Sequence, residues 1–153
     1  MKEVYPHLWI GDLTDYQAST RHRAVISATK TVHSREVRYN GKDDPDYIYV
    51  EKPYHLILNW VDGPSHLYDW STPGLFTRVN DFIDRNRPLG DILVHCDHGL
   101  SRSPTLALVY LAKRTSALPE GFHDAFQEFA RLYPLYSPGG IFDYVAAHWK
   151  EIQ

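Results

Sequence analysis

The sequence predicts an α/β fold with a mainly parallel central sheet of about five strands flanked by helices. Three observations predict this class. Short apolar stretches alternate with helical patterns along the chain. The apolar run in 91–95 is continuous, which is typical of a parallel strand covered on both faces. The helix expected at 104–114 is apolar almost all round, which places it in the middle of a domain.

The chain is expected to form a single domain over residues 1–153. Its mass of 17.7 kDa falls within the usual size of one domain. Apolar residues make up 43% and charged residues 23%, close to the globular norm. A chain of this length can build a core without a disulfide or a metal.

Five apolar stretches are expected to be strands, and turn residues bound most of them. They are residues 8–11, 24–28, 47–50, 55–60 and 91–95. Two stretches between them are rich in turn residues. We expect a long polar excursion at 30–46, which contains Asn40-Gly41 and Asp44-Pro45, and a loop at 61–74.

Helices are expected in the remaining segments. Asp12 or Thr14 can cap a short helix that ends near Ala18. The apolar spacing of Phe76, Val79, Phe82 and Ile83 predicts a helix over 75–85. Three more helices are expected at 104–114, with Pro104 near its first position, at 121–133 and at 140–153.

Charge and cysteine content exclude several classes of protein. The formal charge is −3, and no basic stripe is present, so neither nucleic acid nor membrane is expected as a partner. A single cysteine excludes a disulfide-stapled scaffold. No stretch approaches the about 18 apolar residues of a membrane-spanning helix, and the N-terminus lacks the pattern of a signal peptide. We therefore expect a cytoplasmic location.

The single cysteine lies at the end of the predicted strand 91–95. Cys96 and Arg102 are separated by five residues in a turn that enters a helix. Such a turn directs backbone N–H groups into one concavity, which attracts an anion and stabilises a thiolate. The planar guanidinium of Arg102 matches two phosphate oxygens. Gly99 permits an unusual backbone conformation, and Ser103 can donate a hydrogen bond to the sulfur.

The stretch HCDHGLSRSP, residues 95–104, resembles the His-Cys-x-x-Gly-x-Ser-Arg-Ser signature of the dual-specificity protein phosphatases. These belong to the cysteine-dependent protein tyrosine phosphatase superfamily. The resemblance covers nearly the whole chain. Residues 5–11 are similar to the family's opening strand, and residues 80–96 are similar to its helix and strand before the cysteine.

The resemblance implies a tyrosine-phosphatase-like fold and a protein phosphatase that hydrolyses phosphotyrosine, with phosphoserine and phosphothreonine also open. Cys96 would carry a phosphocysteine intermediate, Arg102 would bind phosphate, Ser103 would steady the departing thiolate, and His95 would support the loop. The resemblance implies no metal or other cofactor. The phosphate loop would comprise Asp97, His98, Gly99, Leu100, Ser101 and Arg102.

In this family an aspartate on an upstream loop is the general acid and base, and two candidates are present. Asp62 lies in Trp60-Val61-Asp62-Gly63-Pro64, which is similar to the Trp-Pro-Asp loop of the larger tyrosine phosphatases, with Val61 in place of proline. We favour Asp62. The loop is longer than expected for the dual-specificity class, which leaves Asp69 open.

Other functions remain open at this stage. The substrate could be a phosphoinositide, an RNA end or a nucleotide rather than a phosphorylated protein or peptide. The chain could also be a catalytically silent phosphate-binding module or a rhodanese-like enzyme. His95, Cys96 and His98 are too crowded on one turn for a good metal site. The oligomeric state is open, with a monomer as the default.

Overall fold

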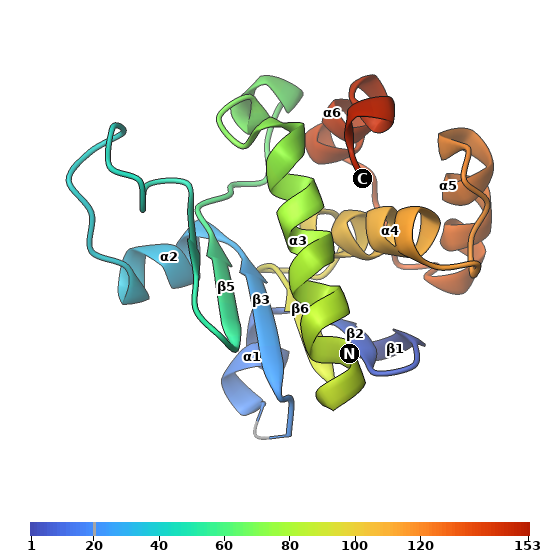
Figure 1. The fold of residues 1–153 in the computed structure, drawn as a ribbon, viewed down its shortest axis with the longest axis horizontal. Helices are drawn as coiled ribbons and strands as arrows, with labels where there is room; N and C mark the ends of the chain where they lie inside the picture. Colours follow the sequence, from blue (N-terminus) through green and yellow to red (C-terminus); the bar gives the residue numbers. More distant parts are fainter. Residues whose placement is uncertain (20) are drawn as a thin grey trace.

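The structure is a computed structural model that describes residues 1–19 and 21–153. Within them, six strands form one sheet in the order β1-β2-β6-β3-β5-β4 (Figure 1). The strands are β1 (Lys2–Tyr5), β2 (Leu8–Gly11), β3 (Ala24–Ala28), β4 (Tyr49–Glu51), β5 (His55–Leu58) and β6 (Ile92–His95). The four inner strands are parallel to one another, and the edge strands β1 and β4 are antiparallel to their neighbours. The predicted α/β fold with a mainly parallel sheet is confirmed.

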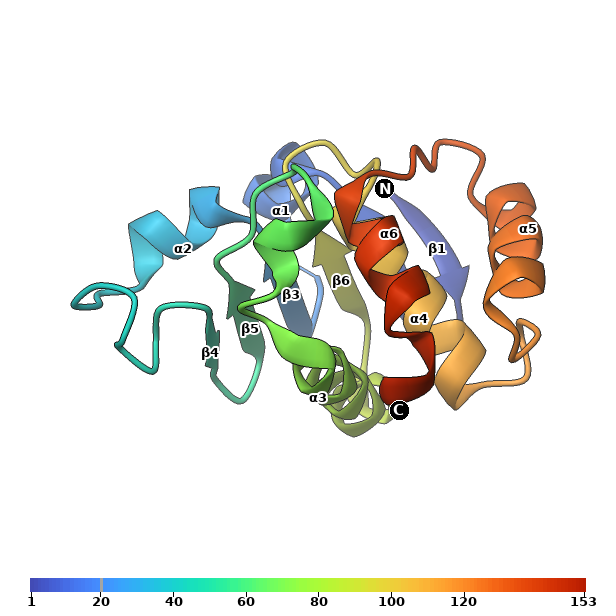
Figure 2. The same cartoon turned by 90° about the horizontal axis from the view of Figure 1, so that it is seen from above.

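Helices cover both faces of this sheet. The helices are α1 (Leu13–Ala18), α2 (Lys30–Glu36), α3 (Thr72–Asn86), α4 (Arg102–Arg114), α5 (Phe122–Leu132) and α6 (Gly140–Ala147). Three short 3₁₀ turns are η1 (Ser65–Tyr68), η2 (Arg87–Leu89) and η3 (Trp149–Glu151). Figure 2 shows α3 and α1 on opposite sides of β3 and β6. None of the helices in the described part of the chain is long and apolar enough to cross a membrane.

α4 lies at the centre of the helical layer. It contacts β2 and β6 on one side and α3, α5 and α6 on the others. Every residue from Arg102 to Ala112 is buried, so the nearly all-round apolar pattern of this helix is explained by neighbours on every side. A single hydrophobic cluster extends from Val4 near one end of the chain to Ile152 near the other.

The parallel register brings the carboxyl ends of the inner strands to one edge of the sheet. Gly11 at the end of β2 and Ser27 near the end of β3 both pair with His95 at the end of β6. The residue that follows His95 therefore lies between two strand ends, where open α/β sheets form their ligand sites.

Strand β1 was not among the strands expected from the sequence. This segment adds a sixth strand at the sheet edge, where only Val4 is buried. An edge strand with one covered residue has too little apolar alternation to be recognised. The predicted strands at 47–50 and 55–60 are observed at Tyr49–Glu51 and His55–Leu58.

The long polar excursion expected at 30–46 begins with a helix that was not predicted. Residues Lys30–Glu36 form α2, and Thr29 caps it by accepting a hydrogen bond from the Thr31 amide at 3.0 Å. The helix has 7 residues, about two turns, and its buried residues are Val32 and His33. So short a helix gives little apolar periodicity.

The predicted helices differ from the observed ones mainly in where they begin or end. α3 begins at Thr72 and α4 at Arg102, both before the predicted starts, because their first turns are polar. α6 ends at Ala147, and η3 replaces the predicted continuation to the C-terminus. Of the two possible caps for α1, Asp12 is the one used, and it exchanges hydrogen bonds with Asp15.

Gly140 positions the loop that follows β5 against α6. A Cβ at this position would overlap the Gly63 carbonyl oxygen and lie 2.6 Å from the Pro64 carbonyl carbon. We expect Gly140→Ala to lower the free energy of unfolding by about 1–3 kcal/mol, because neither backbone can move aside without loss of packing.

Urea denaturation checks this expectation, and Gly121→Ala is the matched control. Gly121 also precedes a helix, but a Cβ there would meet nothing within 4 Å. Equal stability of the two variants would contradict the close packing of α6 on this loop.

Candidate active site

The sulfur of Cys96 is buried directly after β6 and contacts a backbone amide and a hydroxyl group. The Gly99 amide donates to Sγ at 3.3 Å, and the Ser103 hydroxyl oxygen lies 3.3 Å from the same atom. Only 2% of the residue is exposed. Burial and these contacts fix the sulfur at the start of the turn between β6 and α4.

The turn after Cys96 depends on a glycine at position 99. Gly99 has a φ of +70°, and a Cβ there would lie 3.0 Å from the Gly11 carbonyl oxygen. Outside the turn, the Tyr133 hydroxyl donates to the Gly99 carbonyl at 2.8 Å, and the Ser137 amide donates to the Leu100 carbonyl at 2.7 Å. Sequence reasoning missed Tyr133, because nothing near it in the chain indicates a contact with this turn.

Arg102 opens α4 with its guanidinium almost fully buried. Nη1 donates to the Trp60 carbonyl at 2.9 Å, and Nη2 lies 3.5 Å from a carboxylate oxygen of Asp97. Within the described residues, Nε of Arg102 and the hydroxyl of Ser101 are buried without a hydrogen-bond partner. Buried donors left unpaired are costly, so both are suited to an acceptor supplied by a ligand.

Asp97 joins this turn to the start of α2. Its carboxylate accepts hydrogen bonds from the Thr29 hydroxyl at 2.7 Å and the Thr31 hydroxyl at 3.3 Å. Partial burial opposes ionisation of the Asp97 carboxyl group. The Thr29 hydroxyl and the Arg102 guanidinium outweigh it and hold the pKa of Asp97 below its ordinary value of 3.8.

These contacts close a ring around Arg102. The Trp60 carbonyl accepts from the guanidinium and also from the Lys30 amide at 2.8 Å, and Lys30 follows Thr29 directly in the chain. The ring therefore links the Cys96 turn, the start of α2 and the end of β5. Sequence reasoning grouped Asp97 with the phosphate loop but did not foresee that its carboxylate would turn to Thr29 and Thr31.

His95 is buried beneath the turn in its neutral form. Burial lowers the pKa of His95 to about 4. Its ring stacks on Tyr16 with centroids 4.4 Å apart, and Nε2 lies 2.6 Å from the Ser27 hydroxyl oxygen. Nδ1 lies 3.2 Å from the Cys96 carbonyl, which can only accept, so Nδ1 donates and Nε2 accepts from Ser27.

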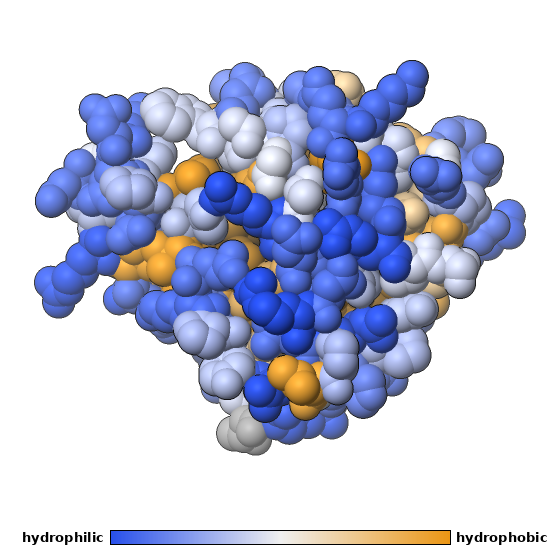
Figure 3. Space-filling view, viewed as in Figure 1, coloured by the Kyte–Doolittle hydropathy of each residue, from blue (hydrophilic) through white to orange (hydrophobic). Residues whose placement is uncertain are grey.

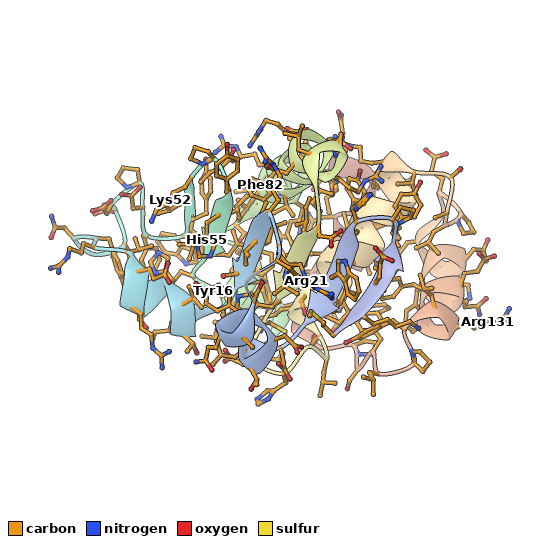
Figure 4. All side chains as sticks on the ribbon, turned by 90° about the horizontal axis from the view of Figure 1, so that it is seen from below. Tyr16, Arg21, Lys52, His55, Phe82 and Arg131 are labelled. Carbon is orange, nitrogen blue, oxygen red and sulfur yellow. The ribbon has the colours of Figure 1, made fainter. Side chains whose placement is uncertain are left out.

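The same serine links His95 to His55 at the start of β5. His55 Nε2 lies 2.8 Å from the Ser27 hydroxyl oxygen, and the Tyr16 ring lies 5.7 Å from the His55 ring. Figure 4 shows Tyr16 and His55 near each other on the face of the sheet that carries α1. Because its ring faces Ser27 and Tyr16, His95 makes no group with His98. Among the described residues, no cluster of three or more His, Cys, Asp or Glu side chains is arranged to hold a metal.

A cleft of about 580 Å³ lies above Arg102. Arg102, Asp97, His98 and Asp62 line it, together with residues at the start of α2. Asp62 lies on the loop after β5, and a Cβ on Gly139 would lie 3.3 Å from its Oδ1 and 3.0 Å from the Ser101 hydroxyl. Asp69 lines no part of this cleft and follows η1 instead. The structure thus places Asp62, and not Asp69, with Arg102.

The curated proteins most similar in sequence to this chain include several dual specificity protein phosphatases. No protein-family model matches the chain. It is 34% identical over 111 residues to dual specificity protein phosphatase 26 of Rattus norvegicus, a match that covers 71% of this chain and 49% of that protein. The chain spans about half the length, or less, of the curated relatives it matches.

Solved structures share the fold over almost the whole chain. DUSP15 superposes with a TM-score of 0.62 at 20% identity, covering 97% of this chain and 86% of that one. PTPMT1 in complex with PI(5)P superposes with a TM-score of 0.60 at 18% identity, covering 98% and 94%. By its sequence relatives and its fold, this chain belongs to the dual-specificity phosphatases of the protein tyrosine phosphatase superfamily.

Proposed function

We propose that residues 1–153 form a catalytic domain that hydrolyses phosphotyrosine in proteins or peptides through a phosphocysteine on Cys96. One observation carries the proposal. The Gly99 amide donates to the buried sulfur at 3.3 Å, and the Ser103 hydroxyl lies at the same distance. In the same turn Arg102, whose buried Nε has no partner among the described residues, lines a cleft that Asp62 also lines. The proposal extends to phosphoserine and phosphothreonine.

In the first step the Cys96 thiolate attacks phosphorus and forms a P–S bond. The P–O bond to the leaving group breaks, and Asp62 as the acid gives its proton to the departing oxygen. Arg102, the backbone N–H groups of the turn and the Ser101 hydroxyl hold the equatorial phosphate oxygens, whose charge they stabilise.

In the second step water attacks phosphorus, and the Asp62 carboxylate accepts its proton. The P–S bond breaks, inorganic phosphate leaves, and Ser103 donates to the returning thiolate at the 3.3 Å contact already present. His95 supports the turn by donating to the Cys96 carbonyl.

A phosphoinositide is the second candidate substrate, because a structural neighbour, PTPMT1, was solved in complex with PI(5)P. The cleft is lined by charges of both signs, because Lys30 and Arg35 line it together with Asp62 and Asp97. The additional phosphates of such a lipid would therefore meet cations as well as carboxylates there.

Cys96→Ser should abolish turnover of p-nitrophenyl phosphate, because the hydroxyl cannot replace the thiolate as nucleophile. We expect a loss of at least about 10³-fold in kcat. The assay is run with a chelator, and wild-type protein should be active under those conditions. Thermal unfolding shows whether the variant is folded. Full activity in a folded Cys96→Ser protein would exclude the phosphocysteine route, and phosphate binding without turnover in the wild type would indicate a silent binding module.

Asp62→Asn should lower kcat on phosphotyrosine by about 10²–10⁴-fold with little change in KM, since the amide cannot give up a proton. The alkaline limb of the pH–rate profile should disappear as well. Asp69→Asn is the matched control, because Asp69 is an exposed aspartate on the same connection between β5 and α3. A larger loss in the control than in Asp62→Asn would assign the acid to Asp69.

The buried neutral His95 should make stability depend on pH in the acid range. Its pKa is about 4 in the fold and 6.5 for an ordinary histidine, so the unfolded chain binds the extra proton first. The contribution is fully present above pH 6.5 and is lost as pH falls towards 4. Denaturant unfolding from pH 7 to 4 should show a smaller decline in His95→Asn than in the wild type. Identical slopes, or an NMR titration of His95 near 6.5, would contradict a desolvated ring.

A further inference from the structure

A second pocket of about 280 Å³ adjoins the cleft. It lies between the segment that follows α2 and the loop that contains η1, and it shares Lys30, Trp60 and Val61 with the cleft. The side chains that line this second pocket have no role in the mechanism proposed above. Pockets that bind drug-sized molecules usually have volumes of about 300 Å³ or more, so this smaller pocket suits a single side chain.

The walls of this second pocket are aromatic and aliphatic. Tyr47 contacts Tyr39 and Trp70, with ring centroids 5.6 and 5.7 Å apart. Val61, Leu67 and Trp70 are 41%, 38% and 53% exposed. These three are among only eight large apolar residues exposed in the described chain, so their gathering around one pocket marks a binding surface. Figure 3 shows apolar surface between residues 38–48 and the segment that follows β5.

Charge adds a preference to this surface. Lys30 lies where the pocket meets the cleft, and Lys42 lies with its ammonium group 5.8 Å from the centre of the Trp70 ring. No described residue that lines the second pocket is acidic. Acidic neighbours of the bound side chain would therefore be attracted at both ends.

The arrangement of the rings favours a peptide side chain over a nucleobase. Bases bind proteins by stacking on aromatic faces. Here the planes of Tyr39 and Tyr47 meet at 58°, and those of Tyr47 and Trp70 at 77°, so these neighbouring rings form no parallel slot between which a base could stack. A phenyl or branched aliphatic group fits such walls, because ring edges and methyl groups pack against it from several directions.

We propose that the second pocket binds a large apolar side chain close to the phosphorylated residue in a phosphopeptide substrate. The proposal rests on the proposed function, since the pocket is continuous with the cleft that would hold the phosphate. Lys30 and Lys42 favour peptides with acidic residues beside that side chain. The pocket would thus select substrates by their sequence and distinguish proteins from lipids and RNA ends.

The test compares phosphotyrosyl peptides that carry phenylalanine in turn at each flanking position with the same peptide carrying alanine. At one position wild-type protein should prefer phenylalanine by about tenfold in kcat/KM, the usual worth of an apolar group in a pocket. Trp70→Ala should bring this ratio close to one. Leu89→Ala is the matched control and should keep the preference. Leu89 is 60% exposed on η2, which leads into the start of β6, whereas Cys96 follows the end of that strand.

Binding gives a second measurement that does not depend on turnover. In Cys96→Ser protein, the phenylalanine peptide should shift the indole N–H resonance of Trp70, and the alanine peptide should leave it in place. No preference in the wild type, an equal preference in Trp70→Ala, or faster turnover of phosphoinositide vesicles or 5′-phosphorylated RNA would overturn the proposal. Turnover of p-nitrophenyl phosphate distinguishes failure of the pocket proposal from failure of the proposed function. If the wild type hydrolyses it without any peptide preference, only the pocket proposal fails; if it does not, the proposed function fails.

Discussion

A buried guanidinium is the constraint on which the candidate site depends. Arg102 is 3% exposed, and a charge in that position is tolerated only with partners that replace water. The Trp60 carbonyl and the Asp97 carboxylate supply them, and each is itself held by the start of α2, through the Lys30 amide and the Thr29 hydroxyl. The need to satisfy one cation therefore ties three separate segments together. Within the described residues, the same ring leaves Nε of Arg102 buried without a hydrogen-bond partner.

The polar groups beneath the turn, His95 and Ser27, are uncharged. His95 has lost its charge through burial and uses both ring nitrogens in hydrogen bonds, one to the Cys96 carbonyl and one with Ser27. With a neutral histidine, the cation of this turn is Arg102, which is paired with Asp97. The Gly99 amide, fixed in direction by the turn, is directed at the Cys96 sulfur.

Much of the fold was accessible from local patterns, and the failures have physical causes. The strand at 91–95 and the helix after it were predicted because continuous burial leaves a continuous apolar sequence. β1 and α2 were missed because each buries few residues and so leaves little periodicity. In the site, Cys96, Gly99, Arg102 and Ser103 were predicted from one short segment. Tyr133 and the Thr29 contact were not, since no local signal in the sequence marks them.

The order strand, turn and helix around Cys96 was determined by the sequence alone. Gly99, at φ +70°, is the residue that such a turn requires, and the spacing to Arg102 follows from the chain itself. Only the tertiary structure decided which distant groups complete the site. Thr29 reaches Asp97 across 68 residues, and Trp60 reaches Arg102 across 42. Such pairs are set by the order and register of parallel strands, and a one-dimensional pattern carries no record of which strand ends become neighbours.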